Sequence, residues 1–402
     1  MSHGSPGKRQ HGLVPSSCPK ADGRTGQLRL RPGKQSKSDL RVMTVRLWTR
    51  PRFRVAMLLA PASILATASL AAQTTVAIEL GPAKLHVDGS SGLEREEFDD
   101  IAVGVLSGNG QALVVDRGKM RVTLLTALPN GHRVTTLGRR GSGPGELREP
   151  KSIHSVGNQF ILLDRALLRL TYYEIRGTDL GLAKTSALTE LPDDVCFLDS
   201  RMVAFGYDPA TRKILRWMPT KTSTEQSGGL PFFEGSANFE SVTNHGILLC
   251  AADYDFVIVA HLNKGVVRAY RSNGRLAWET TLQDFVPWNI KELGDGGVLT
   301  ALSPPLHRAH FTTGLVRLSK QFALLQYGLV TLDESGRMAA NYAAIQSSVL
   351  SLADGKVVGS QSNLPLVLSA NGSSLLATGF EPVPWVEIRV FQLKSKPRQG
   401  VQ

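Results

Sequence analysis

Two consecutive stretches of the chain repeat one pattern and decide its fold class. The first is ALVVDRGKMRVTLLTALPNGHRVTTLG (Ala112–Gly138) and the second is FILLDRALLRLTYYEIRGTDLGLAKTSAL (Phe160–Leu188). Each begins with an apolar run that ends in aspartate, Asp116 or Asp164, and continues through a turn into another β-rich run. The first contains Asn-Gly at 130–131, which marks a tight hairpin because both central turn positions need a positive φ. The pattern predicts strands joined by turns.

Four further strand-and-turn units follow, at residues 201–220, 256–282, 298–332 and 356–380. In the fifth, strands are expected near Val298–Leu302 and Leu329–Leu332. The turns that we take as equivalent lie near residues 130, 177, 221, 273, 335 and 371, so the period centres near 50 residues. Four-stranded propeller blades span about 40–50 residues. We therefore predict an all-β chain, a six-bladed β-propeller over residues 73–402, closed by a strand from 75–89 or from 385–394.

The segment LGRRGSGPGELREPKSIH (Leu137–His154), followed by FILLDRALLRLTYYE, resembles the blade junction of NHL-type propellers and of bacterial exported six-bladed β-propellers. The resemblance implies the same fold. The matching positions are Gly138, Arg139, Gly141, Gly143, Pro144, Gly145, Glu146, Leu147, Pro150 and Asp164.

These glycines invite comparison with a phosphate-binding loop, but such loops lead into a helix whose N-terminus faces the anion. Here the stretch 138–145 leads through Pro150 into a predicted strand. We therefore expect the glycines to let the backbone cross between blades at positive φ. Asp116 and Asp164 are expected to be turn formers that accept hydrogen bonds from nearby backbone amides.

The N-terminal region predicts export. Residues 1–54 hold thirteen of the 46 Lys and Arg and two of the 34 Asp and Glu, which leaves 33 basic and 32 acidic residues in 55–402. A body so balanced argues against a nucleic-acid partner. The apolar run Val55–Leu65 follows these basic residues and precedes small residues suited to cleavage after Ala71 or Ala72, as in a secretory signal. The run is too short for a bilayer-spanning helix.

The predicted domains are therefore a disordered or mis-annotated basic segment (1–42), a signal peptide (43–72) and the propeller (73–402), in a secreted or periplasmic protein. A basic tail that binds an anionic surface is the alternative for the first segment. The exported part keeps Cys196 and Cys250. These cysteines either pair or stay separate, and we favour separate buried thiols because a chain of this size stands without a cross-link.

Catalytic motifs are not evident in the sequence. Six-bladed propellers that resemble lactonases and peptidyl-amide lyases hold a metal with ligands from different blades, and the resemblance implies Ca²⁺ or Zn²⁺ only under that alternative. The H-x-x-H pair of His307 and His310 has no fixed geometry on a loop and is a weak zinc signal. The histidines of the exported part are His86, His132, His154, His245, His261, His307 and His310. A metal-dependent hydrolase or lyase remains the alternative function.

The predicted function is instead a binding scaffold for a protein, peptide or glycan, without a cofactor. The fifth unit carries a long insertion, 303–328, and long loops on rigid scaffolds often hold binding groups. This one gathers His307, Arg308, His310 and Phe311, whose imidazole, guanidinium and aromatic groups suit carboxylates, sugars or peptides. The alternative is that the insertion extends a hairpin and covers the edge of the blade.

Overall fold

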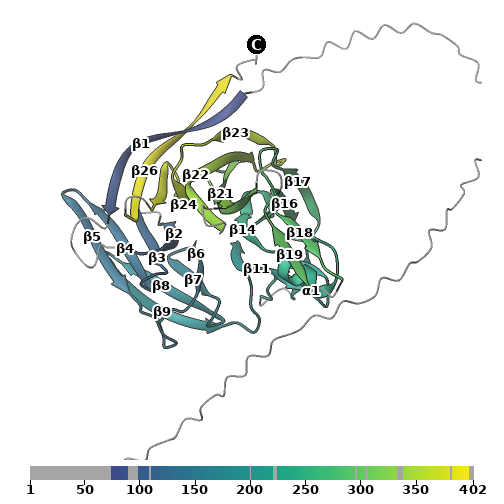
Figure 1. Cartoon of the computed structure of the whole chain (residues 1–402). Helices are drawn as coiled ribbons and strands as arrows, with labels where there is room; N and C mark the ends of the chain where they lie inside the picture. The colour runs from purple at the N-terminus through teal and green to yellow at the C-terminus, as the bar shows by residue number, and fades with distance from the viewer. Residues whose placement is uncertain are drawn as a thin grey trace, which may run out of the picture. The chain divides into compact units, whose positions relative to one another are not determined.

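The computed structural model describes residues 74–88, 98–107, 110–199, 201–220, 224–294, 297–303, 307–332, 338–380 and 383–397. Within these ranges the chain is a six-bladed β-propeller, as the sequence predicts (Figure 1). Six four-stranded antiparallel sheets form the blades, and a short two-stranded hairpin is added to them. The predicted basic segment and signal peptide, 1–72, lie outside the described residues. In the ranges above, no helix has the length and apolar character needed to cross a membrane.

Blades 1 to 5 each use four strands that follow one another in the chain, from the innermost to the outermost. Blade 1 has β2 (Ile101–Leu106), β3 (Gln111–Asp116), β4 (Arg121–Leu128) and β5 (Gly131–Leu137). Blade 2 has β6 (Pro150–Val156), β7 (Gln159–Asp164), β8 (Arg169–Arg176) and β9 (Asp179–Ala187). Blade 3 has β10 (Asp194–Leu198), β11 (Arg201–Asp208), β12 (Lys213–Trp217) and β13 (Gln226–Gly228).

Blades 4 and 5 are separated by the added hairpin. Blade 4 has β14 (Gly246–Ala251), β15 (Phe256–His261), β16 (Val266–Arg271) and β17 (Leu276–Thr281). The hairpin pairs β18 (Asn289–Glu292) with β19 (Val298–Ala301). Blade 5 has β20 (Arg308–Arg317), β21 (Phe322–Leu332), β22 (Met338–Ser351) and β23 (Val357–Gln361).

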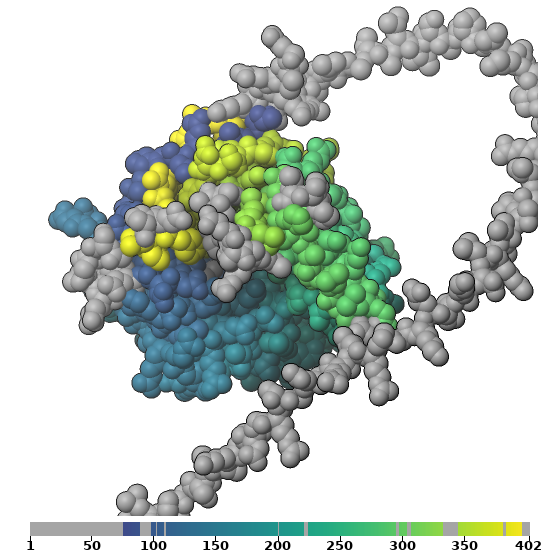
Figure 2. All heavy atoms as spheres, in the orientation of Figure 1, coloured from purple at the N-terminus to yellow at the C-terminus, as the bar shows by residue number. Residues whose placement is uncertain are grey.

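Blade 6 joins the two ends of the propeller. It consists of β24 (Leu366–Asn371), β25 (Ser374–Gly379), β26 (Trp385–Pro397) and, on its outer edge, β1 (Thr74–Asp88). The purple and yellow segments of Figures 1 and 2 therefore lie side by side. Both predicted closing segments are used, because the N-terminal strand pairs antiparallel with the C-terminal one. This pairing ties the two ends of the propeller together.

Hydrophobic packing closes the ring. The inner strands β2, β6, β10, β14, β20 and β24 contact one another in this order, and β24 contacts β2. One apolar cluster lies between each pair of neighbouring blades, including blades 6 and 1. The strand β3 is buried along its whole length, as its apolar run predicts. The cluster between blades 2 and 3 is the smallest of the six, with five buried residues: Ile161, Leu163, Leu170, Val195 and Ala204.

The predicted units match the strands in blades 1 to 4 but are shifted in blades 5 and 6. The first four turns that we treated as equivalent do join, or lie between, the third and outermost strands of their blades. The predicted turn near residue 335 lies outside the described residues, in the segment between β21 and β22, and Asn371-Gly372 joins β24 to β25. Residues 298–301 belong to the added hairpin rather than to a blade. The irregular spacing of the last two turns thus came from comparing different turns.

The insertion between blades 3 and 4 contains a short helix, α1 (Ala237–Thr243). Ser236 begins the helix as its N-cap, because its side-chain oxygen accepts a hydrogen bond from the amide of Phe239 at 3.2 Å. Asn244 ends it, donating from its side-chain amide to the carbonyl of Glu240 at 2.8 Å. The side-chain oxygen of Asn244 also accepts from the amides of Phe232 and Phe233. This one side chain therefore fixes both the end of the helix and the loop before it.

Candidate functional site

The inner strands of all six blades enclose a cavity of about 420 Å³ at the centre of the propeller. Each inner strand contributes two or more lining residues, and the side chains that bring polar groups to the wall include His154, Ser155, Ser369 and Arg317. Small-ligand sites commonly have volumes of about 300–1,000 Å³. The cavity therefore has the size of a site for a small molecule or for one or two residues of a longer ligand.

His154 of β6 lines the cavity, and its ring faces Asp194 of β10, which is not itself a lining residue. The Nε2 atom of His154 lies 4.0 Å from Oδ1 of Asp194, too far for a hydrogen bond. No other hydrogen-bond partner of this nitrogen exists in the described part of the chain. Burial lowers the pKa of His154, and the nearby Asp194 carboxylate opposes this effect. His154 is therefore neutral at pH 7, next to a carboxylate.

A disulfide crosses the wall between blades 3 and 4. Cys196 of β10 and Cys250 of β14 are bonded, with 5.7 Å between their Cα atoms, and both line the cavity. Our expectation of separate thiols is wrong. The two cysteines lie 54 positions apart, about one blade period, so that neighbouring inner strands bring them together. This cross-link is typical of an oxidising compartment.

Ion pairs connect blades 2, 3 and 4 at the end of the channel where the inner strands begin. Arg165 bridges Glu149 at 3.4 Å and Asp193 at 3.3 Å. Asp193 also contacts Nδ1 of His245 at 2.7 Å. Glu149, Asp193 and His245 each lie just before an inner strand, which is why the repeat gathers them. These contacts connect three blades at this end of the channel.

At the opposite end of the channel, Arg317 is the last residue of β20. Its Nη2 atom lies 2.5 Å from Oδ2 of Asp253, and its Nε donates to the carbonyl of Ser319. The guanidinium therefore faces the cavity with its charge already balanced. The cavity wall therefore carries two polar features, the neutral His154 beside Asp194 and the neutralised Arg317.

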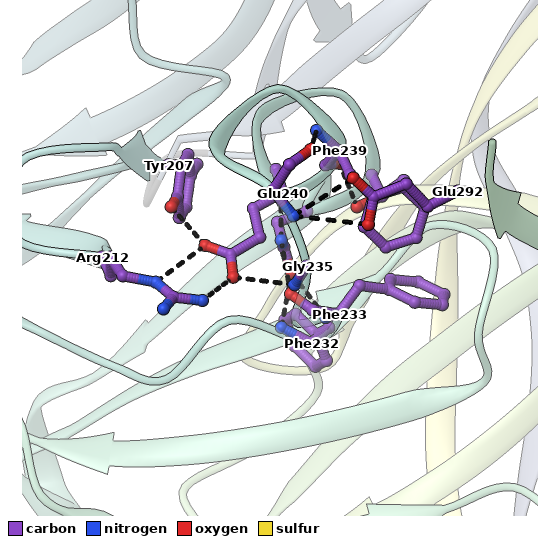
Figure 3. Close-up of polar contacts among 11 residues, drawn as sticks. Tyr207, Arg212, Phe232, Phe233, Gly235, Phe239, Glu240 and Glu292 are labelled. Atoms are coloured by element: carbon purple, nitrogen blue, oxygen red, sulfur yellow. Dashed lines mark hydrogen bonds and ion pairs between the residues drawn. The ribbon is translucent and has the colours of Figure 1, made fainter. Parts of the chain in front are cut away.

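A second buried polar cluster surrounds Glu240 of α1, outside the channel. Figure 3 shows its carboxylate between the phenol of Tyr207 and the guanidinium of Arg212. It also accepts from the amide of Gly235 at 3.0 Å. The Arg212 hydrogen bond, with those from Tyr207 and Gly235, lowers the pKa of Glu240 to about 2 although burial opposes this. Glu240 is thus a charged anchor of the insertion, with its oxygens fully used.

The predicted binding residues do not lie on a loop. Residues 308–317 and 322–332 form β20 and β21, so the expected long loop is wrong and the segment supplies two strands of blade 5. His310 is buried, and its Nδ1 accepts a hydrogen bond from the amide of Val286 at 2.8 Å. Phe311 is partly buried, whereas His307 and Arg308 are exposed. Exposure thus differs among the four residues, and their role in binding stays a prediction.

The glycine motif forms a compact junction between blades 1 and 2. Gly138 and Gly145 have φ values of 96° and 76°, in the region that favours glycine, whereas Gly141 and Gly143 do not. Glu146 accepts hydrogen bonds from Arg139 and from the amide of Gly143, both at 2.7 Å. The motif leads through Pro150 into β6. Leu147 is fully buried and fixes the junction to the core.

The two predicted turn aspartates, Asp116 and Asp164, end the second strands of blades 1 and 2 and are fully buried. Asp116 accepts from the amides of Asp99, Asp100 and Lys119 at 3.1–3.2 Å. Asp164 makes the same three kinds of contact one blade later. Each side chain closes its own turn and also holds the segment that enters the inner strand.

Comparison with known proteins reveals a likeness of fold. A member of the duf4221 family from Bacteroides vulgatus superimposes with a TM-score of 0.52 at 7% identity, covering 81% of this chain and 100% of its own. This shows the propeller fold alone.

Two other solved structures have lower TM-scores, on which no argument rests. A putative exported protein from Bacteroides fragilis has a TM-score of 0.48 at 10% identity, covering 79% of this chain and 95% of its own. Virginiamycin B lyase from Staphylococcus aureus has 0.40 at 7%, covering 78% and 99%. No family model and no curated protein sequence matches the chain.

Neither Asp194 nor His154 is among the predicted binding residues. One local signal for Asp194 was present, since the pair Asp193-Asp194 directly precedes the apolar run VCFL. His154 lies 40 positions earlier and meets Asp194 only because β6 and β10 are neighbours in the ring. Among the residues that the structure describes, no group of three or more His, Cys, Asp or Glu side chains is placed to hold a metal ion.

Proposed function

We propose that this chain is an exported recognition propeller whose central cavity receives part of a peptide, protein or glycan ligand. The cavity of about 420 Å³, walled by all six blades, carries the proposal. Each inner strand pairs with a neighbour on one edge only, so its other edge presents backbone donors and acceptors to the channel. Peptides and sugars bind to such rows of donors and acceptors.

Export is part of the proposal and has two supports. The sequence has the three-part pattern of a secretory signal before residue 73. The Cys196–Cys250 disulfide is of a kind that persists in oxidising compartments and is rare in the cytosol.

Filling the cavity tests the proposal. Ser155 is exposed and lines the cavity, so Ser155→Trp should occupy the space without disturbing the core. Ser186→Trp on the exposed outer strand β9 is the matched control. Wild type and both variants, checked for equal melting temperature, are dialysed against peptide and oligosaccharide fractions of an envelope extract, and the retained compounds are measured by mass spectrometry.

Compounds retained by wild type and by Ser186→Trp should be lost, at least tenfold, from Ser155→Trp. Equal retention by all three proteins would place recognition outside the channel and contradict the proposal.

A further inference from the structure

Blades 2 and 3 meet through polar groups as well as through the smallest apolar cluster of the ring. Ser152 and His154 lie two positions apart on β6, so their side chains leave the strand on the same face. Ser152 is 8% exposed, and neither its Oγ nor Nε2 of His154 has a hydrogen-bond partner in the described ranges. Asp194 faces His154 from β10. Unpartnered buried polar atoms are rare in folded proteins and often mark a site for water or a ligand.

Among the described residues, no cation balances the charge of the Asp194 carboxylate. Its side chain is 6% exposed and accepts hydrogen bonds from two backbone amides, those of Val195 at 2.8 Å and Leu248 at 2.9 Å. In the part of the chain that the structure describes, the one basic side chain within 4.0 Å is His154. Buried carboxylates in proteins are as a rule paired with a positive group. His154 does not supply one, because burial lowers its pKa and leaves it neutral at pH 7.

The charge of Asp194 also favours one tautomer of the His154 imidazole. Nε2 faces the Asp194 oxygen at 4.0 Å, where the carboxylate attracts a ring proton and repels a lone pair, so the proton is favoured on Nε2. Nδ1 then carries a lone pair. No hydrogen bond joins this nitrogen to another described residue, and the ring lines the central cavity. A neutral imidazole of this tautomer accepts a hydrogen bond from a ligand donor, and the carboxylate behind it favours a donor that is positively charged.

We infer that the cavity binds a primary ammonium group of its ligand, which donates to Nδ1 of His154 and is attracted by Asp194. This inference rests on the proposed function and names the chemistry of the ligand. Arg317, which lines the cavity, is balanced by Asp253 and does not oppose a cation strongly. An α-amine of a peptide, a lysine side chain and an amino sugar share this ammonium group.

Three matched pairs of probes separate these sources. They are glycinamide and its N-acetyl derivative, Nα-acetyl-lysine amide and its Nε-acetyl derivative, and glucosamine and N-acetylglucosamine. Each pair differs in one charge at nearly constant shape. Binding is measured at pH 7.5 by calorimetry on wild type, His154→Phe and the control Ser186→Ala, which lies on the exposed outer strand β9. Histidine ¹⁵N spectra of the wild type report the His154 tautomer even if His154→Phe fails to fold.

At least one amine should bind the wild type at least tenfold more tightly than its acetylated partner. The preference should persist in Ser186→Ala and disappear in His154→Phe. The spectra should show the proton on Nε2 and a shift of Nδ1 when the amine is added. The pair that shows the preference identifies the source of the ammonium group.

Equal binding within every pair, no binding of any probe, a preference that survives in His154→Phe, or a proton on Nδ1 would overturn the inference. So would displacement of the amine by Ca²⁺ or Zn²⁺ with spectra of a metal-bound imidazole. The experiments distinguish a failure of this inference from a failure of the proposed function. If Ser155→Trp abolishes retention of extract ligands but amines show no preference, the channel is the recognition site and the ammonium assignment alone is wrong.

Discussion

The junction between blades 1 and 2 and the junction between blades 3 and 4 solve the same structural problem with different side chains. In blade 2, Asp164 accepts from the amides of Arg148, Glu149 and Leu167. In blade 4 the corresponding position is His261, whose Nδ1 accepts from the amide of Asn263 at 3.0 Å. Its Nε2 donates to the carbonyl of Thr243 at 2.8 Å.

The equivalence of the two positions is visible in the backbone. The residue after Asp164 donates its amide to the carbonyl of Glu149, just before β6. The residue after His261 donates in the same way to His245, just before β14. The difference comes from α1, which ends at Thr243 and leaves a helix C-terminal carbonyl in need of a donor. Aspartate only accepts, whereas a neutral histidine both donates and accepts.

The two junctions also differ in covalent chemistry and in pH response. The Cys196–Cys250 disulfide joins blades 3 and 4, whereas blades 1 and 2 are held by the glycine motif and Asp164. His261 is fully buried, and this burial lowers its pKa to about 3. The later junction therefore combines a redox-sensitive bond with an acid-sensitive side chain. Substitutions at the disulfide, Asp164 and His261 test how much each feature contributes to the stability of the fold.

Removing the disulfide should have the largest effect. The double variant Cys196→Ala/Cys250→Ala loses a cross-link between residues 54 positions apart. For a loop of this length, the loop-entropy relation predicts a loss of about 4 kcal/mol in the free energy of unfolding. Urea unfolding measures the loss. Wild type treated with a reductant is the control and should unfold like the variant. A loss below about 1 kcal/mol would mean that the inner strands hold this junction without the bond.

Removing the repeat aspartate should cost somewhat less. Asp164→Ala leaves three backbone amides without their acceptor, and stranding buried donors costs about 1–3 kcal/mol each before water compensates. We expect a loss of roughly 3 kcal/mol in the free energy of unfolding. Asp179→Ala is the matched control, since this exposed aspartate pairs with Arg133 and should matter by less than about 0.5 kcal/mol. Similar losses for the two variants would contradict the role given to Asp164.

The smallest expected effect is on pH dependence. His261 has a pKa of about 3 when folded and an ordinary value near 6.5 when unfolded, so the unfolded chain binds the proton more readily. The stabilising contribution of neutral His261 is complete above pH 6.5 and falls by about 1.4 kcal/mol per pH unit below it, which amounts to about 2.7 kcal/mol at pH 4.5. His261→Gln keeps a donor and an acceptor but does not titrate.

Urea unfolding of wild type and His261→Gln at pH 7.0, 5.5 and 4.5 measures this effect. The stability advantage of the wild type should shrink as the pH falls, because the other titrating groups affect both proteins alike. Parallel curves for the two proteins would show that His261 stays uncharged in the unfolded chain or becomes charged in the folded one.

Comparison of blade 5 with blades 1 and 2 shows where local signals failed. The dipeptide Asn130-Gly131 predicts the hairpin between the outer strands of blade 1. The turn between β20 and β21 contains no Gly, Pro or Asn and is closed by Ser319, whose hydroxyl accepts from the amides of Gln321 and Phe322. Without a turn signal, the sequence predicts a long loop around His310 and Phe311, whereas both residues lie in a strand of ten residues.

The sequence by itself determined the all-β class, the six-fold repeat and the junction built on Gly145 and Asp164. These features follow from local preferences, because apolar runs, turn residues and positive φ positions act within a few residues of one another. Tertiary structure alone decided how the ring closes, because β1 meets β26 from the other end of the propeller. It also decided the bond between Cys196 and Cys250 and the approach of His154 to Asp194. Such contacts join different blades, and their distances depend on how the blades pack around the channel rather than on any neighbour in the chain.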